Sequence, residues 1–383
     1  MTTEQPENFF SLSGWRNPRY KLHVRVVIVS WRDLANPQSG GSEVVIHRLA
    51  LELQRAGHEV ALVCGGPIGP RPYPVVESGG VYSQYLKAPL IVLKHYRDWD
   101  VLLDVENGIP FFSPIWWRGP RICLVHHVHT DQWQTKFGTL GTLLGKFLES
   151  VLMPRIYSRT QFVAISQSTK SALAKIGISE EQIEVIHSGV DIVDSQDSGI
   201  VGEWGAIKSK DPIFVVMGRL VPHKRTHLIL EAWDEVSKSV RGELLVVGDG
   251  PERESLEKLA GDRVRFLGRV DLSERNKLLG KSWMLVHGAH HEGWGLVIIE
   301  AAYFRTPTLA YKAEGVSEAV IDGQTGVLVS NQEDLISTWI YLANNPQELG
   351  RLGANAEERS REFTWRRSGQ KFEDLLRKVN GNE

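Results

Sequence analysis

The chain has 383 residues, of which 42% are hydrophobic and 23% charged, which fits a folded globular protein too long for one core. Its formal charge of −2 gives no sign of a nucleic-acid-binding surface. No stretch approaches the roughly 18 apolar residues of a spanning helix, and residues 1–20 lack the apolar core of a signal peptide. Cys64 and Cys123 lie in apolar runs and are interpreted as buried free thiols. These features predict a cytoplasmic protein of two domains.

The first half of the chain alternates short β-branched runs with helical patterns. Strands are predicted over residues 24–30, 59–64, 101–105, 122–126 and 162–165. Helices are predicted over residues 41–55 and 167–175. Such alternation is typical of a parallel sheet covered by helices.

The same alternation starts again after a polar stretch, residues 191–210, that is rich in Asp, Ser and Gly. Strands are predicted over residues 213–217, 244–247, 264–267, 284–286, 307–310 and 326–329. Two series divided by a polar stretch favour two Rossmann-like domains over one barrel. Open parallel sheets bind ligands at the carboxyl ends of their strands, so two such domains facing each other would share one cleft.

The most informative stretch runs from Glu292 to Glu300 and places two carboxylates around two glycines and a helix start. Gly293 and Gly295 let backbone amides approach an anion, and the first turn of the helix aims unpaired N–H groups at it. This layout suits a nucleotide sugar, with the diphosphate on the amides, sugar hydroxyls on Glu292 and ribose hydroxyls on Glu300. The alternative is a surface glutamate before a glycine turn and an exposed helical glutamate.

Together with Gly218-Arg219-Leu220 and Lys224, this Glu-x7-Glu stretch resembles family 4 of the retaining glycosyltransferases, which have the α/β GT-B fold. The resemblance extends from about residue 24 to residue 365. It implies two Rossmann-like domains that face each other across a cleft. The predicted parts are an acceptor-binding domain over residues 1–190, a linker over 191–211, a donor-binding domain over 212–363, and a helix over 364–383 that packs back on the first domain.

The donor side of the cleft is expected in the second domain. Arg219 and Lys224 follow a predicted strand and can neutralise charge on a departing nucleoside diphosphate. Trp294 stands where the family more often has Phe, and packing is the default role for its larger ring. The resemblance and the glycine turns give a further set of expected donor contacts: Gly41, Gly218, Gly248, Gly293, Trp294, Gly295, Leu296 and Val297.

The acceptor side is expected in the first domain. Gly40, Gly41 and Ser42 precede a predicted helix and are expected to face a phosphate of the donor or of the acceptor. A plain turn with a serine cap is the alternative. By resemblance, His126 lies at the cleft floor, where it contacts the donor sugar or orients the acceptor hydroxyl.

His127 and His129 either shape the acceptor pocket or are solvated. These histidines follow a strand end and lack the helical spacing of common metal sites. Asp98-Trp99-Asp100 matches the Asp-x-Asp pattern of metal-dependent transferases, but it precedes a strand away from the donor half. No essential metal or other cofactor is therefore expected.

Seven apolar residues fall on one helical face: Leu140, Leu143, Leu144, Phe147, Leu148, Val151 and Leu152. The favoured interpretation is a helix whose apolar face points into the core. The alternative is a face that lies on a membrane surface and serves a lipid-linked acceptor.

The predicted reaction is transfer of a hexose from a UDP- or GDP-sugar to an acceptor hydroxyl, with retention of configuration, in the synthesis of a glycan, glycolipid or small glycoside. The expected catalytic residues are His126, Arg219, Lys224 and Glu292. The alternatives are a sugar-nucleotide epimerase, an NAD-dependent oxidoreductase and a non-catalytic nucleotide-sugar-binding protein. The expected partners are the donor and the acceptor, with peripheral membrane contact possible and the oligomeric state open.

Overall fold

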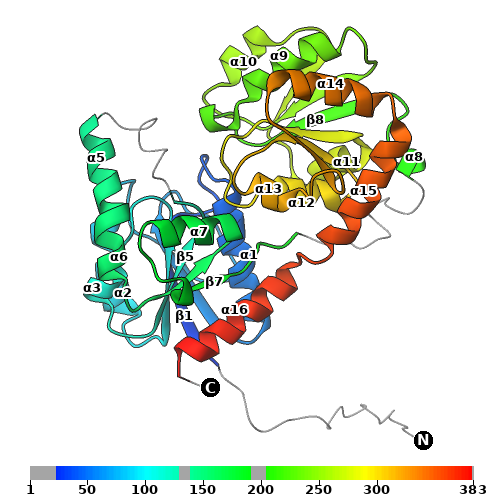
Figure 1. Cartoon of the computed structure of the whole chain (residues 1–383). Helices are drawn as coiled ribbons and strands as arrows, with labels where there is room; N and C mark the ends of the chain where they lie inside the picture. Colours follow the sequence, from blue (N-terminus) through cyan, green and yellow to red (C-terminus); the bar gives the residue numbers. More distant parts are fainter. Residues whose placement is uncertain (1–22, 129–138, 191–203, 382–383) are drawn as a thin grey trace, which may run out of the picture.

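The protein consists of two domains, each built on a parallel β-sheet with helices on its faces, as Figure 1 shows. The structure is a computed structural model that describes residues 23–128, 139–190 and 204–381. The two-domain α/β architecture predicted from the sequence is confirmed.

The first domain contains a seven-stranded sheet in the order β3-β2-β1-β4-β5-β6-β7, with every described pair parallel. Its strands are β1 (Arg25–Arg32), β2 (Glu59–Gly65), β3 (Val75–Glu77), β4 (Val101–Glu106), β5 (Arg121–Val125), β6 (Gln161–Ala164) and β7 (Ile183–Val185). Its helices include α1 (Gly41–Arg55), α2 (Gln84–His95), α3 (Ser113–Trp116), α5 (Thr139–Phe147), a π-helix (Leu148–Leu152), α6 (Met153–Ile156) and α7 (Gln167–Lys175).

The second domain contains a six-stranded parallel sheet in the order β10-β9-β8-β11-β12-β13. Its strands are β8 (Ile213–Met217), β9 (Glu243–Val247), β10 (Val264–Gly268), β11 (Met284–His287), β12 (Thr308–Tyr311) and β13 (Gly326–Val329). Its helices are α8 (Trp204–Ile207), α9 (Thr226–Val236), α10 (Arg253–Leu259), α11 (Leu272–Lys281), α12 (Leu296–Tyr303), α13 (Val316–Ala319), α14 (Gln332–Ala343) and α15 (Pro346–Ser360).

Both sheets change winding direction at one point, between β1 and β4 in the first domain and between β8 and β11 in the second. Such a switch point leaves a crevice outside the carboxyl ends of the flanking strands, because the following loops diverge to opposite faces. The loops after β1, β8 and β11 therefore hold most of the residues singled out from the sequence.

The last helix, α16 (Trp365–Val379), returns to the first domain and packs on α1 (Figure 1). Gly369 makes this contact close, since a Cβ at its position would lie 2.6 Å from Glu52 Cβ. Where the chain first passes from the first domain to the second, Trp204 already packs on the second domain. Its indole N–H donates to the Arg305 carbonyl (3.1 Å), and its ring centroid lies 5.3 Å from that of Trp283. Helix α8, which falls within the predicted linker 191–211, thus packs on the second domain through Trp204.

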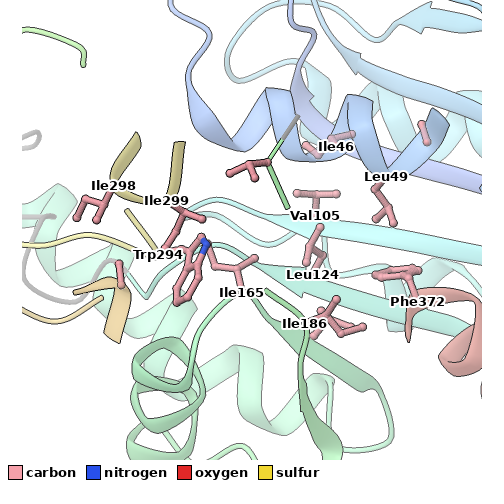
Figure 2. Close-up of a cluster of buried hydrophobic side chains, with 14 of the residues drawn as sticks. Ile46, Leu49, Val105, Leu124, Ile165, Ile186, Trp294, Ile298, Ile299 and Phe372 are labelled. Atoms are coloured by element: carbon pink, nitrogen blue, oxygen red, sulfur yellow. The ribbon is translucent and has the colours of Figure 1, made fainter. Parts of the chain in front are cut away.

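One apolar cluster runs through both domains, from α1 across the first sheet to α12, as Figure 2 shows. Trp294 lies at the seam, 2% exposed, beside Ile165 of the first domain, with its ring 4.3 Å from that of His187. The interpretation of Trp294 as a packing residue is confirmed. Cys64 and Cys123 are buried free thiols, also as predicted.

The prediction that the leucine-rich helix turns its apolar face into the core is wrong. Leu143 is 62% exposed, Leu144 57% and Phe147 51%, whereas Glu149 and Met153 on the opposite side are buried. The side chain of Leu140 lies outside the described part. In the described part of the chain, no helix is long and apolar enough to cross a bilayer.

Glu318 of α13 joins the two domains through three hydrogen bonds. Its carboxylate accepts the backbone N–H groups of Gln167 (2.9 Å) and Ser168 (3.2 Å) at the start of α7, and it lies 2.6 Å from His187 Nε2. Burial raises the pKa of Glu318, but the hydrogen bonds from His187 and the two amides outweigh burial, so the net shift is downward.

We expect Glu318→Gln to lower the melting temperature at pH 7 by about 3–12 °C, because a charge-assisted hydrogen bond contributes about 1.5–3 kcal/mol and each kcal/mol shifts the melting of a domain of this size by about 2–4 °C. A carboxyl whose pKa is lower when folded stabilises above its unfolded pKa, about 4.3, and loses this effect as pH falls through the folded value. Melting curves from pH 7 to pH 3.5 should therefore show the two proteins converging below about pH 4. A difference independent of pH would contradict this role.

Candidate active site

A cavity of about 490 Å³ opens at the seam, between the carboxyl ends of the two sheets. Residues of both domains line it, including all the sequence-predicted site residues that the structure describes. The lining contains the catalytic candidates His126, Arg219, Lys224 and Glu292, and the donor and acceptor candidates Gly40, Gly41, Ser42, His127, Gly218, Gly248, Gly293, Trp294, Gly295, Leu296, Val297 and Glu300. The remaining candidate, His129, lies outside the described residues.

Two glycines fix the loop after β8. Gly218 has φ +153° and Gly248 has φ +133°, and a Cβ on Gly248 would lie 1.9 Å from the Gly218 carbonyl oxygen. No side chain fits at position 248, so the ends of β8 and β9 can approach each other this closely only because this residue is glycine. This contact sets the position of Arg219, the next residue.

Arg219 reaches across the seam to the first domain. A Cβ on Gly40 would lie only 3.2 Å from Arg219 Nε, so the guanidinium lies against the start of α1. Burial lowers the pKa of Arg219, Arg32 lowers it further, and Glu43 and Glu292 oppose them. Arginine is not deprotonated in proteins, so Arg219 remains a cation at neutral pH.

Lys224 and Glu292 form an ion pair on the second-domain side of the cavity. His287, at the end of β11, lies 3.1 Å from the same carboxylate oxygen through its Nε2. Burial raises the pKa of Glu292, but the charge of Lys224 and the hydrogen bond from His287 outweigh it, so the pKa falls well below its usual range. Glu292 is therefore an anion at every physiological pH.

The loop before α12 crosses to the first domain at Gly293. A Cβ at this position would lie 2.4 Å from the His126 carbonyl oxygen and 3.0 Å from Ile165 Cδ1. Gly295 then precedes the helix at φ +74°, which glycine adopts most easily. The amides of Leu296 and Val297, in the first turn of α12, have no acceptor within their own helix and line the cavity.

Glu300 lies one turn further along α12, and Arg275 of α11 pairs with it at 2.9 Å. Both side chains line the cavity and are largely buried. The carboxylate is thus held in one orientation by a cation from a neighbouring helix.

On the first-domain side, Gly40 is the N-cap of α1, and its N–H donates to Glu43 Oε2 (2.6 Å). The alternative of a serine cap at Ser42 is therefore wrong, since Ser42 already lies within the helix. A Cβ on Gly41 would meet nothing within 4 Å, so the backbone there faces the cavity.

His126 follows β5 and is buried, with its carbonyl accepting the Thr169 hydroxyl (3.2 Å). His127 is half-buried and meets His291 of the second domain, with ring centroids 5.8 Å apart. The interpretation of His127 as a solvated residue is therefore disfavoured, because both domains surround it.

Sequence reasoning missed Arg32, Arg275 and His287. Arg32 ends β1, lines the cavity and pairs with Glu43 at 2.9 Å. The position of a polar side chain at a strand's carboxyl end could have indicated Arg32 and His287. No local signal marks Arg275, because its partner lies on another helix.

The described residues contain no group of three or more His, Cys, Asp or Glu side chains that could hold a metal. Asp100, from the Asp-x-Asp pattern, has a structural role. Its Oδ2 accepts the Arg25 backbone N–H (2.7 Å), and its other oxygen pairs with the Arg25 guanidinium (3.0 Å).

Two family models match the chain, Glycosyltransferase Family 4 over residues 39–194 and Glycosyl transferases group 1 over residues 204–359. The chain is 26% identical over 271 residues to an uncharacterized glycosyltransferase of Methanocaldococcus jannaschii, covering 67% of this chain and 68% of that protein. It is 25% identical over 350 residues to the N-acetyl-alpha-D-glucosaminyl L-malate synthase of Bacillus anthracis, covering 84% of this chain and 89% of that protein.

Among solved structures, HepE of Anabaena in complex with UDP and glucose aligns with a TM-score of 0.72 at 18% identity, over 92% of this chain and 99% of that chain. This likeness shows a shared two-domain GT-B fold. Residues 195–203 separate the two matches, which correspond to the two observed domains. The chain therefore belongs to the family 4 glycosyltransferases and is a glycosyltransferase.

Proposed function

We propose that this enzyme transfers a hexose from a UDP- or GDP-sugar to an acceptor hydroxyl with retention of configuration. The observation that carries the proposal is the convergence of Arg219, Lys224, Glu292 and the first amides of α12 on one cavity at the domain seam. The cations and amides would hold the diphosphate, and Glu292 would bind the sugar hydroxyls. The acceptor would enter beside His126 and His127.

In the proposed step, the bond between the sugar anomeric carbon and the diphosphate oxygen breaks, and the acceptor oxygen bonds to the same carbon from the same face. The acceptor proton passes to the leaving phosphate oxygen. Arg219 and Lys224 stabilise the charge that develops on this phosphate, so the mechanism needs alignment and electrostatics and no essential metal.

Each carboxylate that the structure describes in the cavity lining is already bound by another group of the protein. This supports same-face attack by the acceptor over a covalent glycosyl intermediate, which would need a carboxylate as nucleophile. Glu292 is bound by Lys224 and His287, and Glu300 by Arg275. Asp249 accepts the Gly250 amide at 2.8 Å. Among the described residues that line the cavity, no further carboxylate is present to act as a nucleophile.

A ligand and product assay tests the proposal. UDP, GDP and ADP are compared by thermal shift, since a ligand at 100 times its Kd stabilises by about 2.7 kcal/mol. UDP- and GDP-sugars are then screened for turnover with and without EDTA. We expect one nucleotide to raise the melting temperature, turnover that survives EDTA, and a product whose anomeric proton coupling in NMR matches that of the donor. An inverted product, or no nucleotide response, would contradict the proposal.

Glu300→Gln is expected to raise the donor KM about tenfold and to leave kcat within a factor of three. The reason is that a contact to the donor ribose stabilises the bound substrate and the transition state equally, so its loss weakens binding without raising the barrier from the bound state. Initial rates over a donor series measure both constants. Glu333→Gln, at an exposed position in the first turn of α14 that does not line the cavity, is the control. A fall in melting temperature with an unchanged KM would mean that Glu300 only supports Arg275.

A further inference from the structure

The first domain exposes a group of large apolar side chains on four neighbouring elements. Among the described residues, fifteen large hydrophobic side chains are exposed, and eight of them lie on α2, α3, α5 and the π-helix. They are Leu86, Leu90, Leu93, Ile115, Leu143, Leu144, Phe147 and Val151. Large exposed apolar side chains gathered on neighbouring elements mark a place of interaction. We refer to these eight residues as the apolar face.

These elements form one continuous side of the domain, as their buried contacts show. The Ser113 amide, at the start of α3, donates to the Tyr157 hydroxyl just after α6 (3.2 Å). Trp116 at the other end of α3 packs in the same cluster as Ala88 and Val92 of α2. Helix α3 therefore bridges α2 and α6, and Figure 1 shows α2, α3, α5 and α6 along the same edge of the domain.

Basic side chains predominate on these elements, on α6 and on the residues that directly follow α3 and α6. Within residues 84–95, 113–118 and 141–159, the lysines and arginines are Lys87, Lys94, Arg118, Lys146, Arg155 and Arg159. The single carboxylate in these segments is Glu149, which is 1% exposed. This local excess of basic side chains contrasts with the formal charge of −2 of the whole chain.

We propose that the apolar face and its six basic residues form a docking surface for an anionic lipid bilayer. The apolar side chains would enter the boundary between headgroups and acyl chains, and the lysines and arginines would lie at the anionic headgroups. A second copy of the chain fits less well as the occupant, because two copies of a basic surface placed face to face repel each other. These elements belong to the first domain, where the acceptor is proposed to bind. The acceptor would therefore be linked to a lipid, an inference that rests on the proposed function.

Vesicle co-sedimentation with the full chain tests the surface without requiring turnover. The vesicles contain either phosphatidylcholine alone or phosphatidylcholine with about 30% phosphatidylglycerol. We expect at least fivefold more protein to sediment with the anionic vesicles, and binding to weaken in 500 mM NaCl because salt screens the charges. No sedimentation with the anionic vesicles would overturn the proposal.

The matched variants compare two exposed apolar pairs. Leu144→Ser with Phe147→Ser should reduce the bound fraction at least fivefold at an unchanged melting temperature. Leu259→Ser with Leu272→Ser, on the second domain, should leave binding intact. An equal loss in both pairs would overturn the assignment of the surface. So would light scattering that shows a dimer which the first pair converts to a monomer, since the occupant would then be a second copy.

Discussion

Replacing Lys224 with alanine is expected to lower kcat by about 10²–10³, a loss of roughly 2.7–4 kcal/mol of transition-state stabilisation. Lys224 is the cation paired with Glu292, and its side chain is only 19% exposed, so little water is present to take over its charge. In the proposed reaction the leaving diphosphate gains negative charge beside this ammonium group. Steady-state rates with the best donor from the nucleotide screen measure the effect.

A second variant separates catalysis from folding. Lys224→Ala leaves the buried Glu292 carboxylate without its main cation, which destabilises the protein as well. The double change of Lys224→Ala with Glu292→Gln removes the orphaned charge, so its melting temperature should return towards the wild-type value while turnover stays low. Lys277→Ala, on the exposed side of α11, is the control. Turnover within tenfold of wild type, under about 1.4 kcal/mol, would remove Lys224 from the catalytic set.

Much of the fold could be predicted because its strands are buried and rich in β-branched residues. The strands β8 and β13 and the helices α1 and α7 begin and end at the predicted residues. Strands β3 and β7 were missed, since three residues are too few to show a period. The donor loops could be located because glycines and charged residues follow strands, where open sheets bind ligands.

The failures concern contacts between segments distant in the chain. Helical periodicity identified the apolar stripe of α5 correctly, but a stripe does not reveal which side of a helix the domain covers. The domain covers the side of Glu149 and Met153 and leaves Leu144 and Phe147 exposed. Likewise, nothing near Glu318 indicates that its partners lie some 130 to 150 residues earlier. Such pairings depend on how the two domains meet, which local patterns do not encode.

Gly293→Ala is expected to lower the melting temperature by about 2–12 °C and to reduce turnover at least tenfold. The added Cβ would lie 2.4 Å from the His126 carbonyl oxygen and 3.0 Å from Ile165 Cδ1, so the donor loop must retreat from the first domain. Overpacking of this kind costs about 1–3 kcal/mol, and each kcal/mol shifts melting of domains this size by about 2–4 °C. The retreat would also move Glu292, the preceding residue, away from the acceptor side.

Two glycines provide controls for this steric account, because a Cβ at Gly41 or Gly80 would meet nothing within 4 Å. Gly80→Ala, far from the cavity, should change neither melting temperature nor turnover. Gly41→Ala should keep its melting temperature and still lose turnover, since position 41 faces the cavity where the donor phosphates are proposed to lie. If Gly293→Ala behaved like Gly80→Ala in calorimetry and in initial rates, the domains would not meet as closely at this point as the structure shows.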